Sequence, residues 1–291
     1  MLNQLISEER LNKMTSQVHP KNKLNELTAA EWITRTVSVF TQKGLGSKSK
    51  EAEFEKLHPA PFSFTDVSRF VEFFTKKGGN VVDPFGGVAS SAKASAILGR
   101  NCTCIEISPY FANIAKQRMA AELDEPQQEL VTIINGDTRQ VTPTLPENHF
   151  DLILTSPPYW GILDKVDHKA SQERISNGVM HNYGEDPNDL SKIKEYDDFI
   201  ETLAKVFDDL APHVRPKGHA VVIVGDFRHK SRYYMFHSDL ASAMEKNNNW
   251  VLKGIKIMYQ KHKRVFPYGY PYSYVPNLHH QYALVLQREG K

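Results

Sequence analysis

The sequence has few cysteines, no long apolar run and almost no net charge, and the first two shortages each exclude a class of protein. Only two of the 291 residues are cysteine, too few for a disulfide framework or a zinc site, and this usage fits a reducing cytoplasm. No stretch approaches the roughly 18 consecutive apolar residues of a membrane span. The first residues, MLNQLISEER, lack the basic start and apolar stretch of a secretory signal. We therefore expect a cytoplasmic protein that does not enter a membrane.

The net charge of +2, from 36 Lys and Arg against 34 Asp and Glu, identifies no partner, but the charges are unevenly distributed. Residues 251–291 contain seven basic residues and one acid, whereas residues 183–210 contain nine acids and three lysines. A basic carboxyl-terminal part is typical of a surface that faces a polyanion, and equally of a solvated surface.

Seven short apolar runs bounded by turn residues predict β-strands, with helical patterns between most of them. Strands that alternate with helices indicate a mostly parallel sheet covered on both faces. Only a Pro- and Tyr-rich stretch, 260–278, separates the last two strands, which we therefore expect to be antiparallel. The predicted strands are 80–83, 102–107, 130–134, 150–155, 220–224, 251–259 and 281–286.

Two segments fall outside this alternation. Residues 1–57 contain a capping box, Thr28-Ala-Ala-Glu31, that opens a predicted helix. We interpret them as a helical N-terminal extension before a domain at 58–291. Residues 161–195 are polar and rich in turn residues, and a loop of this length is usually a functional lid, a binding loop or a disordered segment.

A glycine turn follows the first predicted strand in Asp83-Pro-Phe-Gly-Gly87. Ligands of open α/β sheets bind at the carboxyl ends of the strands. Glycines there let the backbone approach a ligand, and a helix amino terminus favours a negative group. The dinucleotide fingerprint G-x-G-x-x-G is absent, and on its own the motif could be a tight strand–helix turn.

Two further acids stand at strand ends. Glu106 lies at the end of the second predicted strand, where an acid can accept both hydroxyls of a ribose. Asp137, in Asn135-Gly-Asp137, follows the third strand, where a carboxylate could accept from an adenine amino group. Each alone is typical of a surface acid or a turn former, but together with Asp83 they predict an adenosine pocket.

The fourth predicted strand ends in Thr155-Ser-Pro-Pro-Tyr-Trp160. Consecutive prolines donate no N–H and hold the chain extended, so their carbonyls are free to accept hydrogen bonds. A hydroxyl, a carbonyl and an aromatic face in one short run suit a flat base that bears an exocyclic amine. Ser-Pro-Pro is also an ordinary turn signal.

These motifs, with His58-Pro-Ala-Pro-Phe62 and Ile105-Glu-Ile107, resemble the AdoMet-dependent DNA amino-methyltransferases, and most of all their cytosine-N4 branch. The resemblance runs from residue 27 to the end. It implies an α/β, Rossmann-like class I methyltransferase fold with a seven-stranded, mostly parallel sheet whose last strand is antiparallel. One departure is visible, because the family often has Gly-x-Gly after the phenylalanine, whereas Gly87 is followed here by Val88-Ala89.

The resemblance also implies a cofactor, S-adenosyl-L-methionine (AdoMet), without a metal, and the residues that bind it. Asp83, Phe85 and the glycines would hold its methionine part, Glu106 its ribose, and Ile107 and Asp137 its adenine. Phe62 would close the other side of the pocket. The implied cofactor-binding residues are Phe62, Asp83, Phe85, Gly86, Gly87, Glu106, Ile107 and Asp137.

Methyl transfer would then occur at Ser156, Pro157, Pro158 and Tyr159. The target base would leave the duplex and stack on Tyr159, while Ser156 Oγ and the Pro157 carbonyl accept its amino protons. In the family that the chain resembles, serine at the first position of this motif is the usual sign of cytosine N4 rather than adenine N6. Carbon-5 methylation needs a nucleophilic thiol, and we reject it because both cysteines lie inside a predicted strand.

Two segments are predicted to bind the DNA. One is the 161–195 insertion, with Lys169 and Arg174, and the other is the 260–278 stretch, which begins with Lys261, Lys263 and Arg264. Basic residues would contact phosphates. Aromatic residues recur at every second position from Phe266 to Tyr274, and the alternative is that they pack this connection against the sheet.

The expected substrate is double-stranded DNA, with a restriction endonuclease as a possible partner of the same system. The oligomeric state, monomer or homodimer, is left open. Competing interpretations are an adenine-N6 DNA methyltransferase, an RNA or protein amino-methyltransferase, a DNA-binding module that has lost catalysis, and a simple nucleotide-binding protein.

Overall fold

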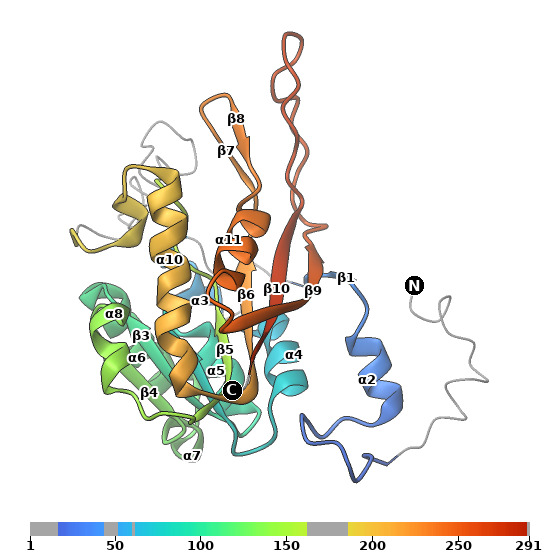
Figure 1. The fold of residues 1–291 in the computed structure, drawn as a ribbon, viewed down its shortest axis with the longest axis vertical. Helices are drawn as coiled ribbons and strands as arrows, with labels where there is room; N and C mark the ends of the chain where they lie inside the picture. Colours follow the sequence, from blue (N-terminus) through green and yellow to red (C-terminus); the bar gives the residue numbers. More distant parts are fainter. Residues whose placement is uncertain (1–16, 44–51, 60–61, 162–185, 290–291) are drawn as a thin grey trace.

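An eight-stranded sheet forms the centre of the molecule (Figure 1). The computed structural model describes residues 17–43, 52–59, 62–161 and 186–289. The strand order is β1-β9-β10-β6-β5-β2-β3-β4, and β10 is antiparallel to both of its neighbours while the remaining pairs are parallel. The strands are β1 (Val39–Thr41), β2 (Asn80–Asp83), β3 (Asn101–Glu106), β4 (Val131–Asn135), β5 (Phe150–Thr155), β6 (Val214–Val224), β9 (Trp250–Tyr259) and β10 (His280–Arg288).

Helices cover both faces of this sheet. Helices α4 (Phe64–Phe74), α5 (Ser90–Ile97) and α6 (Pro109–Glu122) contribute to one apolar core, and α10 (Tyr196–Leu210) and α11 (Phe236–Glu245) to the other. Successive strand residues point to opposite faces, so Leu152 and Leu154 join the first core and Ile153 the second. The shorter elements are α2 (Ala29–Arg35), α3 (Ala52–Glu55), α7 (Glu125–Gln128), α8 (Thr138–Val141), η2 (Thr142–Thr144), η3 (Leu190–Lys192) and η4 (Ala211–His213).

The strand order reverses at β2, and this reversal fixes where a ligand can enter. From β2 the chain builds outward through β3 and β4, then crosses back to place β5 and β6 on the other side. The carboxyl ends of β2 and β5 therefore lie side by side with their following loops turned apart. In open α/β sheets this crevice is where ligands bind.

The predicted strands are all present, and the expected antiparallel pairing of the last two is confirmed. The prediction of seven strands was wrong by one, because β1 adds a parallel edge strand beside β9. It is three residues long and buries only Phe40, which is too short for a periodic signal. Helix α11 and a ribbon formed by β7 (Phe227–His229) and β8 (Arg232–Tyr234) were also not predicted.

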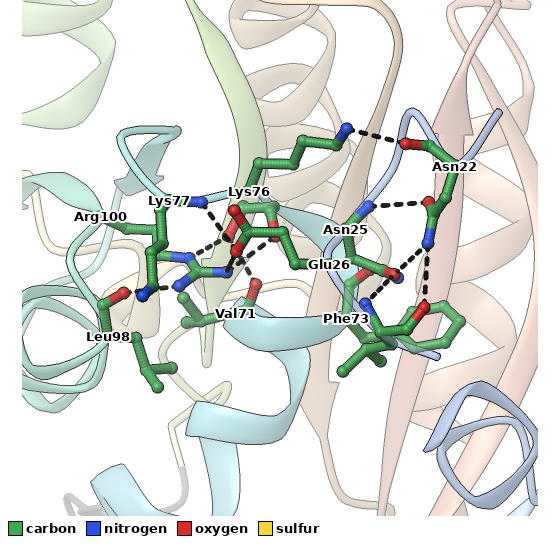
Figure 2. A network of polar contacts seen from close by, with 11 residues as sticks. Asn22, Asn25, Glu26, Val71, Phe73, Lys76, Lys77, Leu98 and Arg100 are labelled. Atoms are coloured by element: carbon green, nitrogen blue, oxygen red, sulfur yellow. Dashed lines mark hydrogen bonds and ion pairs between the residues drawn. The ribbon is translucent and has the colours of Figure 1, made fainter. Parts of the chain in front are cut away.

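The N-terminal segment is fastened to the domain by polar contacts as well as by β1 (Figure 2). Asn25 is fully buried, and its Nδ2 donates to the Phe73 carbonyl at 2.6 Å. Arg100, also buried, donates to the Thr75 carbonyl and to Glu26. The capping box at Thr28 is confirmed. The domain boundary at residue 57 stays a prediction, with residues 17–43 joined to the sheet and to α4.

We expect Asn25→Ala to lower the free energy of unfolding by about 1–3 kcal/mol, because it leaves buried backbone groups without partners. The Phe73 carbonyl loses its donor, and the Leu27 N–H loses the Asn25 Oδ1 that accepts from it at 3.0 Å. Urea unfolding measures the change. Lys21→Ala, at an exposed position of the same segment, serves as the control, and equal stability of the two variants would contradict the role of this network.

Candidate active site

A pocket opens at the carboxyl ends of β2, β3, β4 and β5, which is the crevice that the strand order creates. Its empty space amounts to about 620 Å³, including the part open to solvent. Most of its wall comes from residues just past the strand ends. The lining residues are His58, Pro84, Phe85, Glu106, Ile107, Gly136, Asp137, Thr138, Ser156, Pro158, Asn188, Asp189 and Leu190.

Asp83 lies behind this wall and connects three segments of the chain. Its side chain is fully buried and accepts from Phe85 N–H at 3.0 Å, Ser91 Oγ at 2.5 Å and Thr155 Oγ1 at 2.6 Å. Loss of solvation raises the pKa of Asp83 to about 6, against the lowering effect of these bonds. Asp83 thus ties the end of β2 to the end of β5 and to α5, and its predicted contact with AdoMet stays a prediction.

The glycine turn after β2 has little room for side chains. Gly87 has a φ of +52°, and a Cβ there would lie 3.2 Å from the His58 ring. A Cβ on Gly86 would lie 3.0 Å from Cys104. Ala89, which stands in place of the second glycine of the family's Gly-x-Gly, also adopts the left-handed conformation, at φ +61°. The departure from the family pattern therefore preserves the turn at a conformational cost of about 1–2 kcal/mol.

Glu106 contributes a buried carboxylate to the pocket. One oxygen accepts from Gly87 N–H at 2.7 Å and the other from Ser108 N–H at 2.8 Å. Burial raises the pKa of Glu106 to about 7, and the charges of Asp83 and Asp189 add to this shift. Because each carboxylate oxygen has two lone pairs, Glu106 keeps acceptor capacity for a ligand while it fixes the glycine turn.

Asp137 lines the pocket as predicted, but the sequence did not indicate its partner. Arg139 donates to the two Asp137 oxygens from Nε at 3.0 Å and from Nη2 at 2.6 Å. Arg139 Nη2 also donates to the Asn188 carbonyl at 2.7 Å. A ligand amino group would therefore share the Asp137 carboxylate with a guanidinium.

Residues 188–190 close the pocket from a distant part of the chain and were not predicted from the sequence. Asp189 is buried and caps η3 by accepting from Ser191 N–H at 2.9 Å. Trp160 Nε1 donates to the Ile193 carbonyl at 2.8 Å, which ties this segment to the end of the Ser-Pro-Pro-Tyr motif. The only signal for these residues was their place in the long polar stretch after the fourth strand.

The Ser-Pro-Pro-Tyr motif spans the border between the pocket and the second core. Ser156 and Pro158 line the pocket, whereas Pro157 is buried. The Tyr159 ring packs against Phe227 and Phe236, with centroids 6.4 and 5.7 Å away. Burial raises the pKa of the Tyr159 hydroxyl, which remains a neutral donor and acceptor.

The structure brings together six of the predicted residues on the pocket wall. Phe62 packs on the first core instead, and Asp83, Gly86, Gly87, Pro157 and Tyr159 stand beside or behind the wall. His58, Arg139, Asn188 and Asp189 were not predicted as site residues. The six are Phe85, Glu106, Ile107, Asp137, Ser156 and Pro158.

The residues predicted to bind DNA fall into two groups. Lys169 and Arg174 lie outside the described residues. Lys261, Lys263 and Arg264 are exposed on the connection between β9 and β10, which extends away from the sheet (Figure 1). The alternative that the aromatic side chains pack this connection against the sheet was wrong, because Tyr270, Tyr272 and Tyr274 are 81%, 94% and 88% exposed.

Metal-binding clusters and membrane-spanning helices are both lacking in the part of the chain that the structure describes. Within 17–43, 52–59, 62–161 and 186–289, no three His, Cys, Asp or Glu side chains gather in a way that could hold a metal ion. Over the same ranges, no helix is long and apolar enough to cross a membrane.

Among solved structures, the chain is similar to TrmN from Thermus thermophilus, with 13% identity and a TM-score of 0.48, over 82% of this chain and 53% of TrmN. It is also similar to a protein described as a DNA modification methylase of Thermus thermophilus, solved with AdoMet. There the identity is 21% and the TM-score 0.37, over 54% of each chain. The chain thus spans about half the length of both, and no curated protein matches it.

A family model described as DNA methylase, for N6- and N4-methyltransferases, matches residues 6–117 and 150–291. This match covers most of the chain and includes every strand except β4. It also includes the glycine turn, Glu106 and the Ser-Pro-Pro-Tyr motif. The chain therefore belongs to the N6/N4 DNA methylase family of AdoMet-dependent methyltransferases.

Proposed function

We propose that the protein transfers a methyl group from AdoMet to the exocyclic N4 amine of cytosine in double-stranded DNA. The observation that carries this proposal is the position of Ser156 on the wall of the pocket that also holds Glu106 and Asp137. A hydroxyl acceptor thus lies in the same cavity as the carboxylates that suit a nucleoside. By family, the enzyme would act in a restriction–modification system beside a nuclease.

The pocket fits AdoMet by the chemistry of its residues. AdoMet carries a sulfonium and an ammonium group, and the wall presents three carboxylates, from Glu106, Asp137 and Asp189. Glu106 would accept from the ribose hydroxyls, and Asp137 from the adenine amino group. Ile107 offers an apolar surface to the adenine ring. When bound, AdoMet supplies a methyl group that is already activated by the positive sulfur.

The protein's contribution to the transfer is then mainly positioning. Ser156 Oγ and the Pro157 carbonyl would accept the hydrogens of the target amine and direct its lone pair into the pocket. Tyr159, held by the surrounding aromatic rings and by a 3.5 Å contact from Gln281 Nε2, would stack on the flipped base. Base flipping costs a few kcal/mol, which contacts with the DNA must offset.

Transfer of a tritiated methyl group from AdoMet tests the substrate class. Unmethylated duplex DNA and tRNA are incubated in parallel with the purified protein. We expect label in the DNA and none in the tRNA. Label in the tRNA alone would favour the RNA amino-methyltransferase, and label in neither, with AdoMet bound, would favour a module that has lost catalysis.

We expect AdoMet affinity to rise with pH up to about 7, the pKa of Glu106. Ribose hydroxyls donate to the ionised carboxylate, so below this pKa binding requires loss of a proton, and affinity falls by up to about tenfold per pH unit. Calorimetry at pH 6 in buffers of different ionisation enthalpy measures the number of protons released when AdoMet binds. An affinity that is constant from pH 6 to 8 would contradict the assignment of Glu106 to the ribose.

Stability without ligand should change with pH in the opposite direction. The pKa values of Asp83 and Glu106 are raised to about 6 and about 7 from 3.8 and 4.5. The folded protein therefore retains protons that the unfolded chain releases. Their contribution to stability is present at low pH and is lost as the pH rises through these values.

A further inference from the structure

The connection between β9 and β10, residues 260–279, is a projecting arm with an unusual surface. Figure 1 shows it rising from the sheet beyond the β7–β8 ribbon. Single exposed apolar residues are common, but a group of exposed aromatic residues marks an interaction site. The exposed large side chains are Val265, Phe266, Tyr268, Tyr270, Tyr272 and Tyr274, with exposed fractions of 48% to 94%.

The arm starts at the end of the sheet where the active site lies, beyond the carboxyl ends of the parallel strands. Strands β2, β5, β6 and β9 all run in one direction, as the parallel pairs and the antiparallel β10 between β6 and β9 require. The arm follows the carboxyl end of β9, and the β7–β8 ribbon follows that of β6. The arm and the ribbon therefore both extend from the end of the sheet where the pocket opens.

The arm has a defined shape at its base and tip. Phe266 and Asn277 pair across it, since Phe266 N–H donates to Asn277 Oδ1 at 2.9 Å and Asn277 Nδ2 donates back to the Phe266 carbonyl at 2.8 Å. At the tip, the N–H groups of Tyr272 and Ser273 both donate to the Gly269 carbonyl at 2.8 Å. Gly269 has a φ of +76°, and a Cβ there would overlap Ser273. The tyrosines are thus presented on a folded turn.

The charge of both projections is positive. Between Tyr259 and His280 the sequence has Lys261, Lys263 and Arg264 and no acid. The β7–β8 ribbon adds Arg228, Lys230 and Arg232, again without an acid between its first and last residues. Cations here would attract the phosphates of DNA. Two copies of the arm would instead bring like charges together, which disfavours self-association through this surface.

We propose that the tip tyrosines Tyr270, Tyr272 and Tyr274 bind DNA by stacking on exposed base faces, while the cations of the β7–β8 ribbon hold the phosphates. This inference rests on the proposed function, because it takes the substrate to be DNA. Tyrosine suits this role, since its rigid side chain loses little conformational entropy on contact. Every base has a flat face, so stacking tolerates many sequences. The tip would steady the duplex that is distorted when the target base leaves it.

The test replaces the three tip tyrosines with serine and measures binding of a labelled, unmethylated duplex by fluorescence anisotropy. We expect the Kd for DNA to rise by about tenfold or more. The AdoMet Kd should not change, because the arm is absent from the pocket wall. The matched variant with three phenylalanines keeps the ring faces and should bind DNA like the wild type.

A second variant separates stacking from charge. Changing Arg228, Lys230 and Arg232 to glutamine should reduce the slope of log K against log salt by up to about 0.9 for each phosphate that is no longer neutralised. The tyrosine-to-serine variant should leave that slope unchanged. If the tyrosine-to-serine variant binds DNA as tightly as the wild type, the assignment of the tip to DNA binding is wrong. Sedimentation that shows a wild-type dimer and a monomeric variant, with DNA binding unchanged, would assign the tip to self-association instead. A wild-type protein that binds AdoMet but no DNA would instead contradict the proposed function.

Discussion

Ser156→Ala is expected to lower the rate of methyl transfer about 100-fold while the AdoMet Kd changes little. The hydroxyl is placed to accept a hydrogen of the target amine, and a positioned proton acceptor contributes roughly 10²–10⁴-fold to catalysis. Ser156 reaches the pocket wall, but the buried bonds that shape the pocket belong to Asp83 and Glu106. The substitution should therefore affect the reaction and leave the fold intact.

Single-turnover kinetics with saturating AdoMet measures this loss directly. Ser156→Thr retains the hydroxyl and is the matched variant, with an expected activity between those of the wild type and the alanine variant. Full turnover by Ser156→Ala would exclude the serine hydroxyl from the reaction and would leave the Pro157 carbonyl as the remaining proposed acceptor.

Glu106→Gln is expected to weaken AdoMet binding by about 10- to 100-fold, although it replaces only one carboxylate oxygen with an amide NH₂ group. Both carboxylate oxygens accept from backbone N–H groups, of Gly87 and Ser108. Glutamine has one acceptor oxygen, so its amide nitrogen must face one of these donors and leave it unpaired. A buried, unpaired donor costs about 1–3 kcal/mol, and the glycine turn beside the cofactor would move.

Calorimetry with AdoMet measures the affinity, and thermal unfolding measures how far the substitution lowers the stability of the folded protein. Glu129→Gln makes the same chemical change at an exposed position and should alter neither. Asp83→Asn is a useful contrast, because the Ser91 hydroxyl can rotate and accept from the new amide, so this variant should lose less stability. Wild-type affinity in Glu106→Gln would mean that the pocket does not depend on this carboxylate.

The sequence predicted those parts of the fold that rest on local patterns. Strand β5 begins and ends at the predicted residues, because it is a short, mostly apolar run bounded by turn residues. Helix α10 follows the helical spacing of its apolar side chains, which lie on one buried stripe. Strand β6 begins six residues before the predicted start. Its first part, Arg215-Pro-Lys-Gly, resembles a turn, and Lys217 has a φ of +66°.

The site was predictable where it depends on the ends of consecutive strands. Glu106 and Asp137 follow neighbouring strands, so their positions could be read from the strand pattern. Asn188 and Asp189 could not, because they reach the pocket from a segment about 50 residues further along the chain, where Arg139 donates to the Asn188 carbonyl. The exposure of the arm tyrosines was equally hidden, since alternating aromatic residues also fit a strand packed on the sheet.

Mass spectrometry of the nucleosides from treated DNA decides whether this pocket methylates cytosine at N4. Unmethylated duplex DNA is incubated with AdoMet and the wild-type protein or Ser156→Ala, then digested to nucleosides. We predict N4-methylcytosine from the wild type and a sharp loss of it from the variant. N6-methyladenine in its place would contradict the assignment of the base, and N4-methylcytosine formed equally by Ser156→Ala would contradict the assignment of the site.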